Sequence, residues 1–226
     1  MTGASRGIGR AIAESLAGAG AQVTLVARGA DALHEVAHGI GDRAVVAPCD
    51  VSDANAVAVL VASLKANNIV PHILVNNAGT FPLAPLDEME PAAFEQAIRT
   101  NLVAPFIVLR ALLPEMKVRG SGHVVTVGSV SDRSVFVGNG AYAASKYGQR
   151  AMHEVLRQEL RGTGVRATLV SPAATDTPIW DPIDPDNRPG FPSRASMLHP
   201  VDVAEAVLWA VTRPARVNVD EVRLSS

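Results

Sequence analysis

The sequence has few or none of the features that mark disulfide-linked, nucleic-acid-binding, membrane-spanning or secreted proteins. Its 226 residues include one cysteine, Cys49, which excludes an internal disulfide and fits a reducing compartment. The net charge of −2 gives no electrostatic reason to expect nucleic acid or an anionic membrane as a partner. No apolar run reaches the roughly 18 residues of a membrane span, and no basic region followed by an apolar stretch marks a signal peptide. These absences favour a cytoplasmic protein with neither kind of partner, and no metal is expected.

Apolar residues, by contrast, are plentiful. They make up 48% of the chain against 19% for charged residues, enough to bury one sizeable core. The length suits a single large domain over residues 1–226. Short apolar runs predict strands at 22–27, 43–50, 72–79, 123–130, 166–171 and 218–224. Longer amphipathic runs predict helices at 8–18, 30–39, 52–65 (capped by Ser52), 91–118, 141–161 and 201–212.

This alternation of strands and helices predicts a doubly wound, three-layer α/β sandwich with a mostly parallel sheet. Ligands of such sheets bind at the carboxyl ends of the strands. The alternation breaks at residues 178–200, which hold six prolines. We expect this stretch to form a mobile substrate loop.

Three glycines at the start of the chain, Gly3, Gly7 and Gly9, indicate a turn that leads into a helix. Glycines let backbone amides approach a pyrophosphate at a helix N-terminus, where the partial positive charge favours it. Taken alone, the turn could equally be a tight connection without a ligand. Its pattern is T-G-x-x-x-G-x-G, which differs from the G-x-G-x-x-G of the common dinucleotide-binding turn.

Together with five motifs further along the chain, this turn resembles that of the short-chain dehydrogenase/reductase family. The other motifs are CDVSD at 49–53, NNAG at 76–79, Asn101 in the long helix, YAASK with a serine thirteen residues before its tyrosine, and SPAATDT at 171–177. The last motif departs mildly from the family pattern, because Ala173 stands where the family has a glycine. In this order the motifs are highly specific, and they run through nearly the whole chain.

The resemblance implies a Rossmann-type fold and a nicotinamide-dependent enzyme that interconverts a carbonyl and an alcohol. Tyr142 would be the general acid/base, and Ser129 would hold the substrate oxygen. Lys146 would support the tyrosine and reach the ribose hydroxyls, while Asn101 would hold a water that links Lys146 to solvent. The residues implied to bind the cofactor are Gly3, Ser5, Arg6, Gly7, Ile8, Gly9, Arg28, Asp50, Val51, Asn77, Ala78, Gly79, Tyr142, Lys146, Pro172, Thr175 and Thr177.

The four-residue spacing of Tyr142 and Lys146 puts both side chains on one face of a helix. A free tyrosine has a pKa of about 10, and bringing it to about 7 requires roughly 4 kcal/mol of preferential phenolate stabilisation. A lysine ammonium about 4 Å away supplies on the order of 4 kcal/mol at an effective dielectric constant of 20. The sequence therefore predicts that Lys146 is about sufficient to lower the pKa of Tyr142. Without the other motifs, such a pair is more often a surface pair.

The end of the second predicted strand favours NADP(H) over NAD(H). Members specific for NAD carry an acidic residue there to bind the ribose 2′-hydroxyl. Here the strand ends at Arg28, and no acid follows until Asp31. A guanidinium binds a 2′-phosphate with paired hydrogen bonds, and Arg6 can approach from the other side. The alternative is that both arginines are solvated surface charges.

The substrate is expected among Ser129, residues 133–139, the turn at Phe81 and the loop 178–200. Aromatic side chains in these segments predict an apolar contribution to binding, from Phe136, Trp180 and Phe191.

Three arginines, Arg133, Arg188 and Arg194, could meet a substrate carboxylate, although each is more often a surface charge. Residues 201–224 resemble members that oxidise small 3-hydroxy acids such as serine or 3-hydroxypropionate. A small 3-hydroxy acid or a β-keto compound is therefore a candidate substrate.

The resemblance also implies assembly. In the family, the long helix and the helix after Tyr142 form a dimer interface, so we expect a homodimer or homotetramer. The extended branch of the family shares the tyrosine and lysine, but its T-G-x-x-G-x-x-G turn and longer substrate domain are absent here. The alternative that stays open is an N-terminally truncated, weakly active or inactive binding protein on the same fold.

That alternative comes from the start of the sequence. In the family, the threonine of the glycine turn follows an apolar first strand in the middle of the sheet, and here Met1 occupies its last position. The first strand is thus expected to be missing or truncated. Each lost buried aliphatic side chain would cost about 1.5–3 kcal/mol, against a total stability of about 5–15 kcal/mol. We hypothesise that the natural chain begins several residues upstream, the alternatives being a rearranged sheet or a strand donated by a partner.

Overall fold

Strands and helices alternate through residues 1–226, all of which the computed structural model describes. The strands are β1 (Val23–Ala27), β2 (Ala44–Pro48), β3 (Ile73–Asn76), β4 (Gly122–Val127), β5 (Val165–Pro172) and β6 (Glu221–Leu224). The α-helices are α1 (Gly7–Gly18), α2 (Ala30–Ile40), α3 (Ala54–Ala66), α4 (Pro91–Ile98), α5 (Ala104–Arg119), α6 (Gly140–Glu159) and α7 (Pro200–Val211). A π-helical segment (Arg99–Val103) joins α4 to α5, and single 3₁₀ turns cover Val130–Asp132, Pro178–Trp180, Pro185–Asn187 and Arg194–Ser196.

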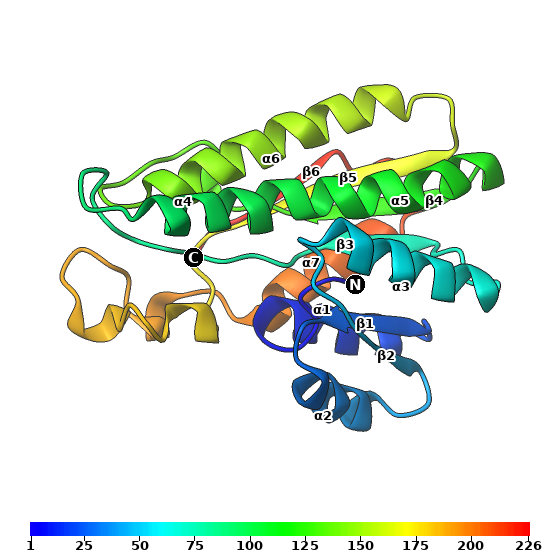
Figure 1. The fold of residues 1–226 in the computed structure, drawn as a ribbon, viewed down its shortest axis with the longest axis horizontal. Helices are drawn as coiled ribbons and strands as arrows, with labels where there is room; N and C mark the ends of the chain where they lie inside the picture. Colours follow the sequence, from blue (N-terminus) through cyan, green and yellow to red (C-terminus); the bar gives the residue numbers. More distant parts are fainter.

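The layers are those of a doubly wound sandwich. All strand pairs are parallel, and helices cover both faces of the sheet (Figure 1). The core is accordingly divided in two. One buried cluster joins α1, α2 and α7 to the sheet, and the other joins α3, α5 and α6 to its opposite face. This arrangement confirms the predicted fold class and places the carboxyl ends of the strands along one edge.

The middle of the sheet is unusual, because the first two residues stand where a central strand would lie. The ladders are β1–β2 and β3–β4–β5–β6, and Thr2 bridges to Val26 between them. The Val26 N–H donates to the Met1 carbonyl at 2.9 Å, and the Thr2 N–H donates to the Val75 carbonyl at 3.0 Å. Met1 and Thr2 therefore connect the two halves of the sheet.

The start of α3 differs from the prediction. Its N-cap is Asp53, whose side chain accepts the N–H of Asn55 at 2.8 Å, and not Ser52. Ser52 instead donates its N–H and its hydroxyl to Oδ1 of Asp50, at 2.9 and 2.7 Å. The preceding carboxylate competes for the serine, so the helix begins one residue later than a Ser52 cap would place it.

The long helix predicted over 91–118 is present but contains the π-helical segment. Within it the Ala104 N–H donates to the Arg99 carbonyl, five residues back. Pro105 has no N–H to offer the Asn101 carbonyl four residues before it, so the α-helical ladder is interrupted there. By length and composition alone the run Pro91–Arg119 could cross a membrane, but core helices of soluble proteins pass the same test, and 33% of its most apolar window is buried.

Candidate active site

The glycine turn adopts the geometry that the sequence predicted. Gly3 has a φ of +65°, which disfavours other residues. A Cβ on Gly9 would lie 2.0 Å from the Gly3 carbonyl oxygen, so only glycine fits there. Arg6 precedes α1 without a side-chain hydrogen bond to its first turn, and that turn holds no acidic residue. The helix N-terminus is therefore free of protein anions and suited to a phosphate.

Thr2 and Asn77 fix this turn against the end of β3. The Thr2 hydroxyl accepts the N–H groups of Asn77 and Ala78 at 3.0 and 3.2 Å. The Asn77 amide donates to the carbonyls of Thr2 and Gly3, both at 3.2 Å. The NNAG motif thus holds the glycine turn in place through side-chain and backbone hydrogen bonds.

A cavity of about 1090 Å³ opens over the carboxyl ends of the strands. Every residue predicted to bind the cofactor lines it, as do Ser129, Tyr142 and Lys146. Asn101 does not line the cavity, because its side chain is fully buried in the protein. The structure therefore brings the predicted cofactor residues together around one space, which exceeds the roughly 300–1,000 Å³ of a typical small-molecule pocket.

The groups in this cavity fit a dinucleotide with a 2′-phosphate. Arg28 follows β1 directly and lines the cavity together with Arg6, and both side chains are exposed. The acidic residues of the lining are Asp50 and Asp181. Two hydrogen bonds from Ser52 are the main cause of the lowered pKa of Asp50, and Arg28 lowers it further. Asp31 lies outside the lining, so no carboxylate of the β1–α2 turn opposes a phosphate there.

Tyr142 stands at the start of α6 and Ser129 at the end of the β4 segment, both facing the cavity. The Ser129 hydroxyl also accepts the N–H of Ser131 at 3.1 Å, which fixes its direction. Desolvation raises the pKa of Tyr142 to about 12, while a hydrogen bond with Ser129 opposes this rise. In this structure the phenol is therefore protonated at neutral pH.

Lys146 is buried, and its ammonium is hydrogen-bonded within the protein. Its ammonium donates to the Val127 carbonyl and to Oε1 of Gln149, both at 3.0 Å, and lies 5.7 Å from the centroid of the Tyr142 ring. Desolvation lowers the pKa of Lys146 to about 8. The prediction that Lys146 brings the pKa of Tyr142 to about 7 is wrong for this structure. The simple charge-pair argument omitted the desolvation of both groups.

Asn101 occupies the π-helical segment and bonds three neighbours. Its Oδ1 accepts the Thr80 N–H at 2.8 Å, and its Nδ2 donates to the Thr80 carbonyl and to the Ser145 hydroxyl, both at 2.9 Å. The Asn101 carbonyl, freed by Pro105, accepts Nε2 of Gln149 at 2.9 Å. Gln149 thus links Lys146 to Asn101, and sequence reasoning missed it. The signal available in the sequence was Pro105, which stands four residues after Asn101 and cannot donate a hydrogen bond to the Asn101 carbonyl.

A buried carboxylate lies behind the serine. Asp132 is fully buried, accepts the Ser171 hydroxyl at 2.7 Å, and pairs with Nε of Arg133 at 2.6 Å. Arg133 also reaches Glu221 of β6 at 2.5 Å. Arg133, considered as a carboxylate ligand, is therefore occupied by two acids of the protein and lies outside the cavity lining.

Aromatic rings form the substrate end of the cavity. Phe81 packs edge-on against the Tyr142 ring at a centroid distance of 4.5 Å and against Trp180 at 5.1 Å. Phe191 lies 6.0 Å from Phe136 and 6.1 Å from Trp180. All of these rings line the cavity. We call Phe81, Phe136, Trp180 and Phe191 the aromatic wall.

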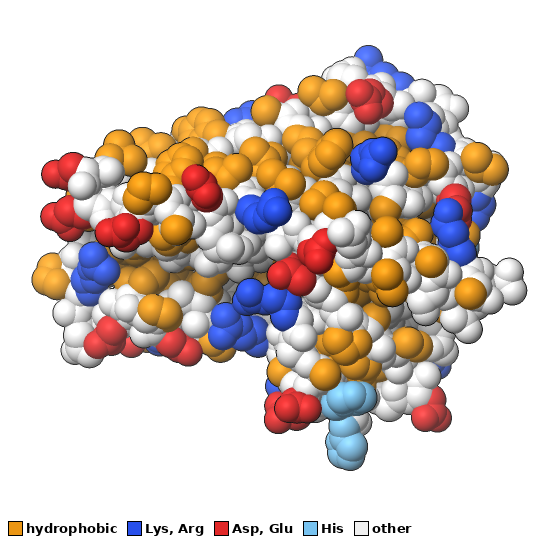
Figure 2. Space-filling view, viewed as in Figure 1, with side chains coloured by type: hydrophobic (Ala, Val, Ile, Leu, Met, Phe, Trp, Pro, Cys, Tyr) orange, Lys and Arg blue, Asp and Glu red, His pale blue; other side chains and the backbone are white.

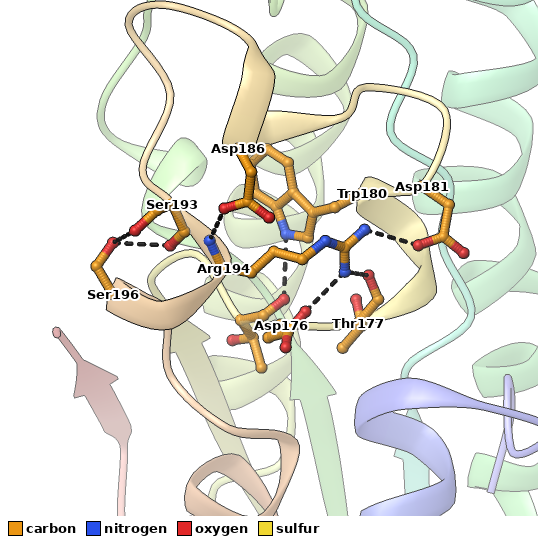
Figure 3. A network of polar contacts seen from close by, with 9 residues as sticks. Asp176, Thr177, Trp180, Asp181, Asp186, Ser193, Arg194 and Ser196 are labelled. Atoms are coloured by element: carbon orange, nitrogen blue, oxygen red, sulfur yellow. Dashed lines mark hydrogen bonds and ion pairs between the residues drawn. The ribbon is translucent and has the colours of Figure 1, made fainter.

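Residues 178–200, which we call the lid, are held by Arg194 (Figure 3). Its guanidinium donates to Asp176 and Asp181, each at 2.7 Å, and its backbone N–H donates to Asp186 at 2.8 Å. Trp180 donates its indole N–H to the Thr175 carbonyl at 3.1 Å. The lid is therefore fixed to the end of β5 by polar contacts as well as by its apolar residues.

A parallel sheet, a glycine turn at a helix N-terminus and a tyrosine–lysine pair in one cavity define a nucleotide-binding oxidoreductase of the α/β class. The chain belongs to the short-chain dehydrogenase family, whose model matches residues 1–188. The remaining residues contain α7 and β6.

Relatives and solved structures cover nearly the whole chain. An uncharacterized oxidoreductase of Staphylococcus saprophyticus is 37% identical over 226 residues, covering 98% of this chain and 94% of the relative. Serine dehydrogenase from Escherichia coli is 32% identical with a TM-score of 0.86, covering 98% of this chain and 94% of that one. A closed form of serine dehydrogenase complexed with NADP⁺ is 31% identical with a TM-score of 0.90, covering 99% and 92%.

Proposed function

We propose that this protein is an NADP(H)-dependent oxidoreductase that interconverts a ketone or aldehyde and an alcohol by hydride transfer. The observation that carries the proposal is the placement of Ser129, Tyr142 and Lys146 in the same cavity as the glycine turn. The glycine turn and the strand ends would hold the dinucleotide, and Pro172, Thr175 and Thr177 would border its nicotinamide end. The bound nicotinamide would supply hydride to the carbonyl carbon or accept it from the alcohol.

Three side chains of the site would bind the substrate oxygen and transfer its proton. Tyr142, protonated at neutral pH, donates its proton to the carbonyl oxygen during reduction and takes it back during oxidation. Ser129 donates a hydrogen bond to the same oxygen and holds it in line with the phenol. Lys146 stabilises the phenolate that forms, and its charged fraction near pH 8 depends on its lowered pKa. The water relay through Asn101 stays a prediction.

The preference for NADP(H) has its support in the charges around the adenine end. Arg28 and Arg6 line that end, and neither side chain makes a hydrogen bond or ion pair within the protein. The solved serine dehydrogenase complex contains NADP⁺. The similarity to serine dehydrogenase keeps a small 3-hydroxy acid as a candidate substrate. The residues that line the cavity favour a different class of substrate.

A homodimer or homotetramer is part of the proposal. Apolar side chains gather over α5 and α6 in the upper part of Figure 2. Phe106 of α5 and Tyr147 and Val155 of α6 are exposed. Contact through these helices would cover them. A cytoplasmic location stays a prediction.

The deciding experiment assays the purified protein with both cofactors against small aldehydes, β-keto esters and 3-hydroxy acids, following the absorbance of the reduced nicotinamide. Tyr142→Phe should lower kcat by about 10²–10⁴-fold while NADPH binding, measured by fluorescence, stays within about twofold. The phenyl ring keeps its packing on Phe81 but has no proton to transfer. NADPH binding without turnover of any compound would favour the alternative of a binding protein.

A further inference from the structure

We propose that the substrate is an uncharged carbonyl compound, or the matching alcohol, that carries an aromatic ring beside the reacting carbon. This inference rests on the proposed function and names the substrate class of the same site. It starts from the surroundings of Tyr142, whose ring packs against Phe81 at 4.5 Å. A substrate whose oxygen meets the Tyr142 hydroxyl must place its neighbouring atoms against the aromatic wall.

The aromatic wall is built from three separate parts of the chain. Phe81 follows β3, Phe136 follows β4, and Trp180 and Phe191 belong to the lid. Their ring contacts are all edge-to-face. Aromatic rings favour such edge-to-face and offset arrangements with a further ring. Rings that converge on one space from three segments present both faces and edges to a flat aromatic group.

The wall is also fixed in place. Trp180 is buried and donates its indole N–H to the Thr175 carbonyl. It forms a small core with Ile183 and Met197, against which Phe81 and Phe191 pack. A preformed apolar surface needs little ordering when a ligand binds, which favours affinity for an apolar group.

Positive charge is missing from this end of the cavity. The basic residues that line the cavity are Arg6, Arg28 and Lys146, and the two arginines belong to the glycine turn and the end of β1. Lys146 is committed to the Val127 carbonyl and Gln149. A substrate carboxylate on the aromatic wall would thus have no free cation to pair with.

The three arginines that could have served a carboxylate are each used elsewhere. Arg133 pairs with Asp132 and Glu221. Arg194 pairs with Asp176 and Asp181 (Figure 3). Both lie outside the lining of the cavity.

Arg188 is the third arginine, and it stacks on Phe191 with its guanidinium carbon 5.1 Å from the ring centroid. It is exposed and lines a separate shallow depression of the lid. The one acid of the lid that lines the cavity, Asp181, is already paired with Arg194 and supplies no positive charge. Burying a carboxylate there without a partner is unfavourable, so the site selects against 3-hydroxy acids and for neutral compounds.

The test compares ketones matched in size. The methyl ester of 4-acetylbenzoate and 4-acetylbenzoate itself differ in charge, while acetophenone and cyclohexyl methyl ketone differ in aromaticity. We expect kcat/KM with NADPH to favour the ester over the acid by about 100-fold. We expect acetophenone to exceed cyclohexyl methyl ketone by about tenfold. L-serine and 3-hydroxypropionate should give less turnover than 1-phenylethanol in the oxidative direction.

Binding is measured separately, by calorimetry of each ketone with the protein and saturating NADP⁺. This separates the inference from the proposed function. Preferential binding of the ester without turnover would overturn the proposed reaction and leave the substrate class standing. Equal or tighter binding of 4-acetylbenzoate would overturn the substrate class whether or not turnover occurs.

Three variants test whether the preference comes from the aromatic wall. Phe136→Leu should reduce the ratio of acetophenone to cyclohexyl methyl ketone several-fold, whereas Phe94→Leu in α4, outside the cavity, should leave the ratio unchanged. Arg188→Ala should leave the discrimination between ester and acid unchanged. If the wild type uses 4-acetylbenzoate and Arg188→Ala abolishes that use, the lid arginine turns inward and the inference is wrong.

Discussion

The ammonium of Lys146 donates a hydrogen bond of 3.0 Å to Oε1 of Gln149, and the other end of that amide donates to the Asn101 carbonyl at 2.9 Å. A buried glutamine thus supports the lysine on one side, while Pro105 frees the carbonyl that orients it. Gln149 is 2% exposed and lies outside the cavity lining, so an effect on the proposed reaction would pass through Lys146. We regard it as a positioning residue.

Gln149→Met should lower the pKa of Lys146 further, because a buried ammonium loses an acceptor worth about 1.5–3 kcal/mol. At 1.36 kcal/mol per unit, this corresponds to a shift of about one pH unit or more. The alkaline limb of kcat/KM for carbonyl reduction should therefore move to lower pH. Gln149→Glu puts a carboxylate beside the ammonium, raises the pKa of Lys146 and should move the limb to higher pH.

A purely structural role for Gln149 would change the melting temperature and the amount of active protein without moving the pH profile. Superimposable profiles for wild type, Gln149→Met and Gln149→Glu would therefore contradict the assignment. The profiles are recorded with protein whose NADPH binding has been confirmed by fluorescence.

Under the proposed preference for NADP(H), Arg28→Asp should move the preference toward NAD. Loss of a guanidinium and gain of a carboxylate at the end of β1 would remove the paired hydrogen bonds proposed for a 2′-phosphate and add repulsion to it. We expect the ratio of kcat/KM values for the two cofactors to change by about 10²-fold or more toward NAD. Arg10→Asp makes the same change in net charge on α1 outside the cavity and serves as the control. An unchanged ratio in Arg28→Asp would mean that Arg28 does not contact the phosphate.

The sequence predicted the layers of the fold and the residues around the cofactor cavity because those features follow from local patterns. Apolar periodicity sets strands and helices, and the motifs recur at fixed positions along them. The partners of Lys146, by contrast, come from long-range geometry. Gln149 lies one helical turn beyond the lysine, but its contact with Asn101 depends on how α6 packs on the π-helical segment. The prediction for the pKa of Tyr142 was wrong for the same reason, since desolvation depends on packing around the phenol.

Arg194→Met should loosen the lid and raise the KM of the carbonyl substrate several-fold with a smaller change in kcat. The methionine keeps much of the apolar stem, but the contacts with Asp176 and Asp181 are lost. Limited proteolysis of residues 178–200 should become faster. Arg150→Met removes a helical ion pair with Glu154 away from the cavity and controls for loss of a surface charge. If both variants behave alike in KM and proteolysis, Arg194 does not hold the lid.

Two buried histidines should make the protein less stable in mild acid. His123 bonds the Thr168 hydroxyl at 2.7 Å and His153 bonds the Thr126 hydroxyl at 2.9 Å, while His123 Nδ1 and His153 Nε2 have no partner. Desolvation lowers the pKa of each to about 4. Arg166 adds to this effect at His123, as Arg157 does at His153, where Asp220 partly opposes it.

Each histidine is thus neutral in the folded chain at a pH where it is protonated in the unfolded chain. The unfolded state binds more protons between about pH 6.5 and pH 4, so the free energy of unfolding must fall as the pH falls through that window. The slope is at most about 1.4 kcal/mol per pH unit for each histidine. Urea titrations from pH 8 to pH 5 should show a flat region above pH 7 and a decline below it.

The single variant His153→Gln should remove about half of that decline, because glutamine can still bond Thr126 and does not titrate. Its stability at pH 8 should be lower than that of the wild type, so the measured quantity is the slope against pH and not the absolute value. His34→Gln changes an exposed histidine of α2 and should leave the slope unchanged. A decline as steep in His153→Gln as in the wild type would show that His153 takes up a proton inside the fold and does not contribute to the acid sensitivity.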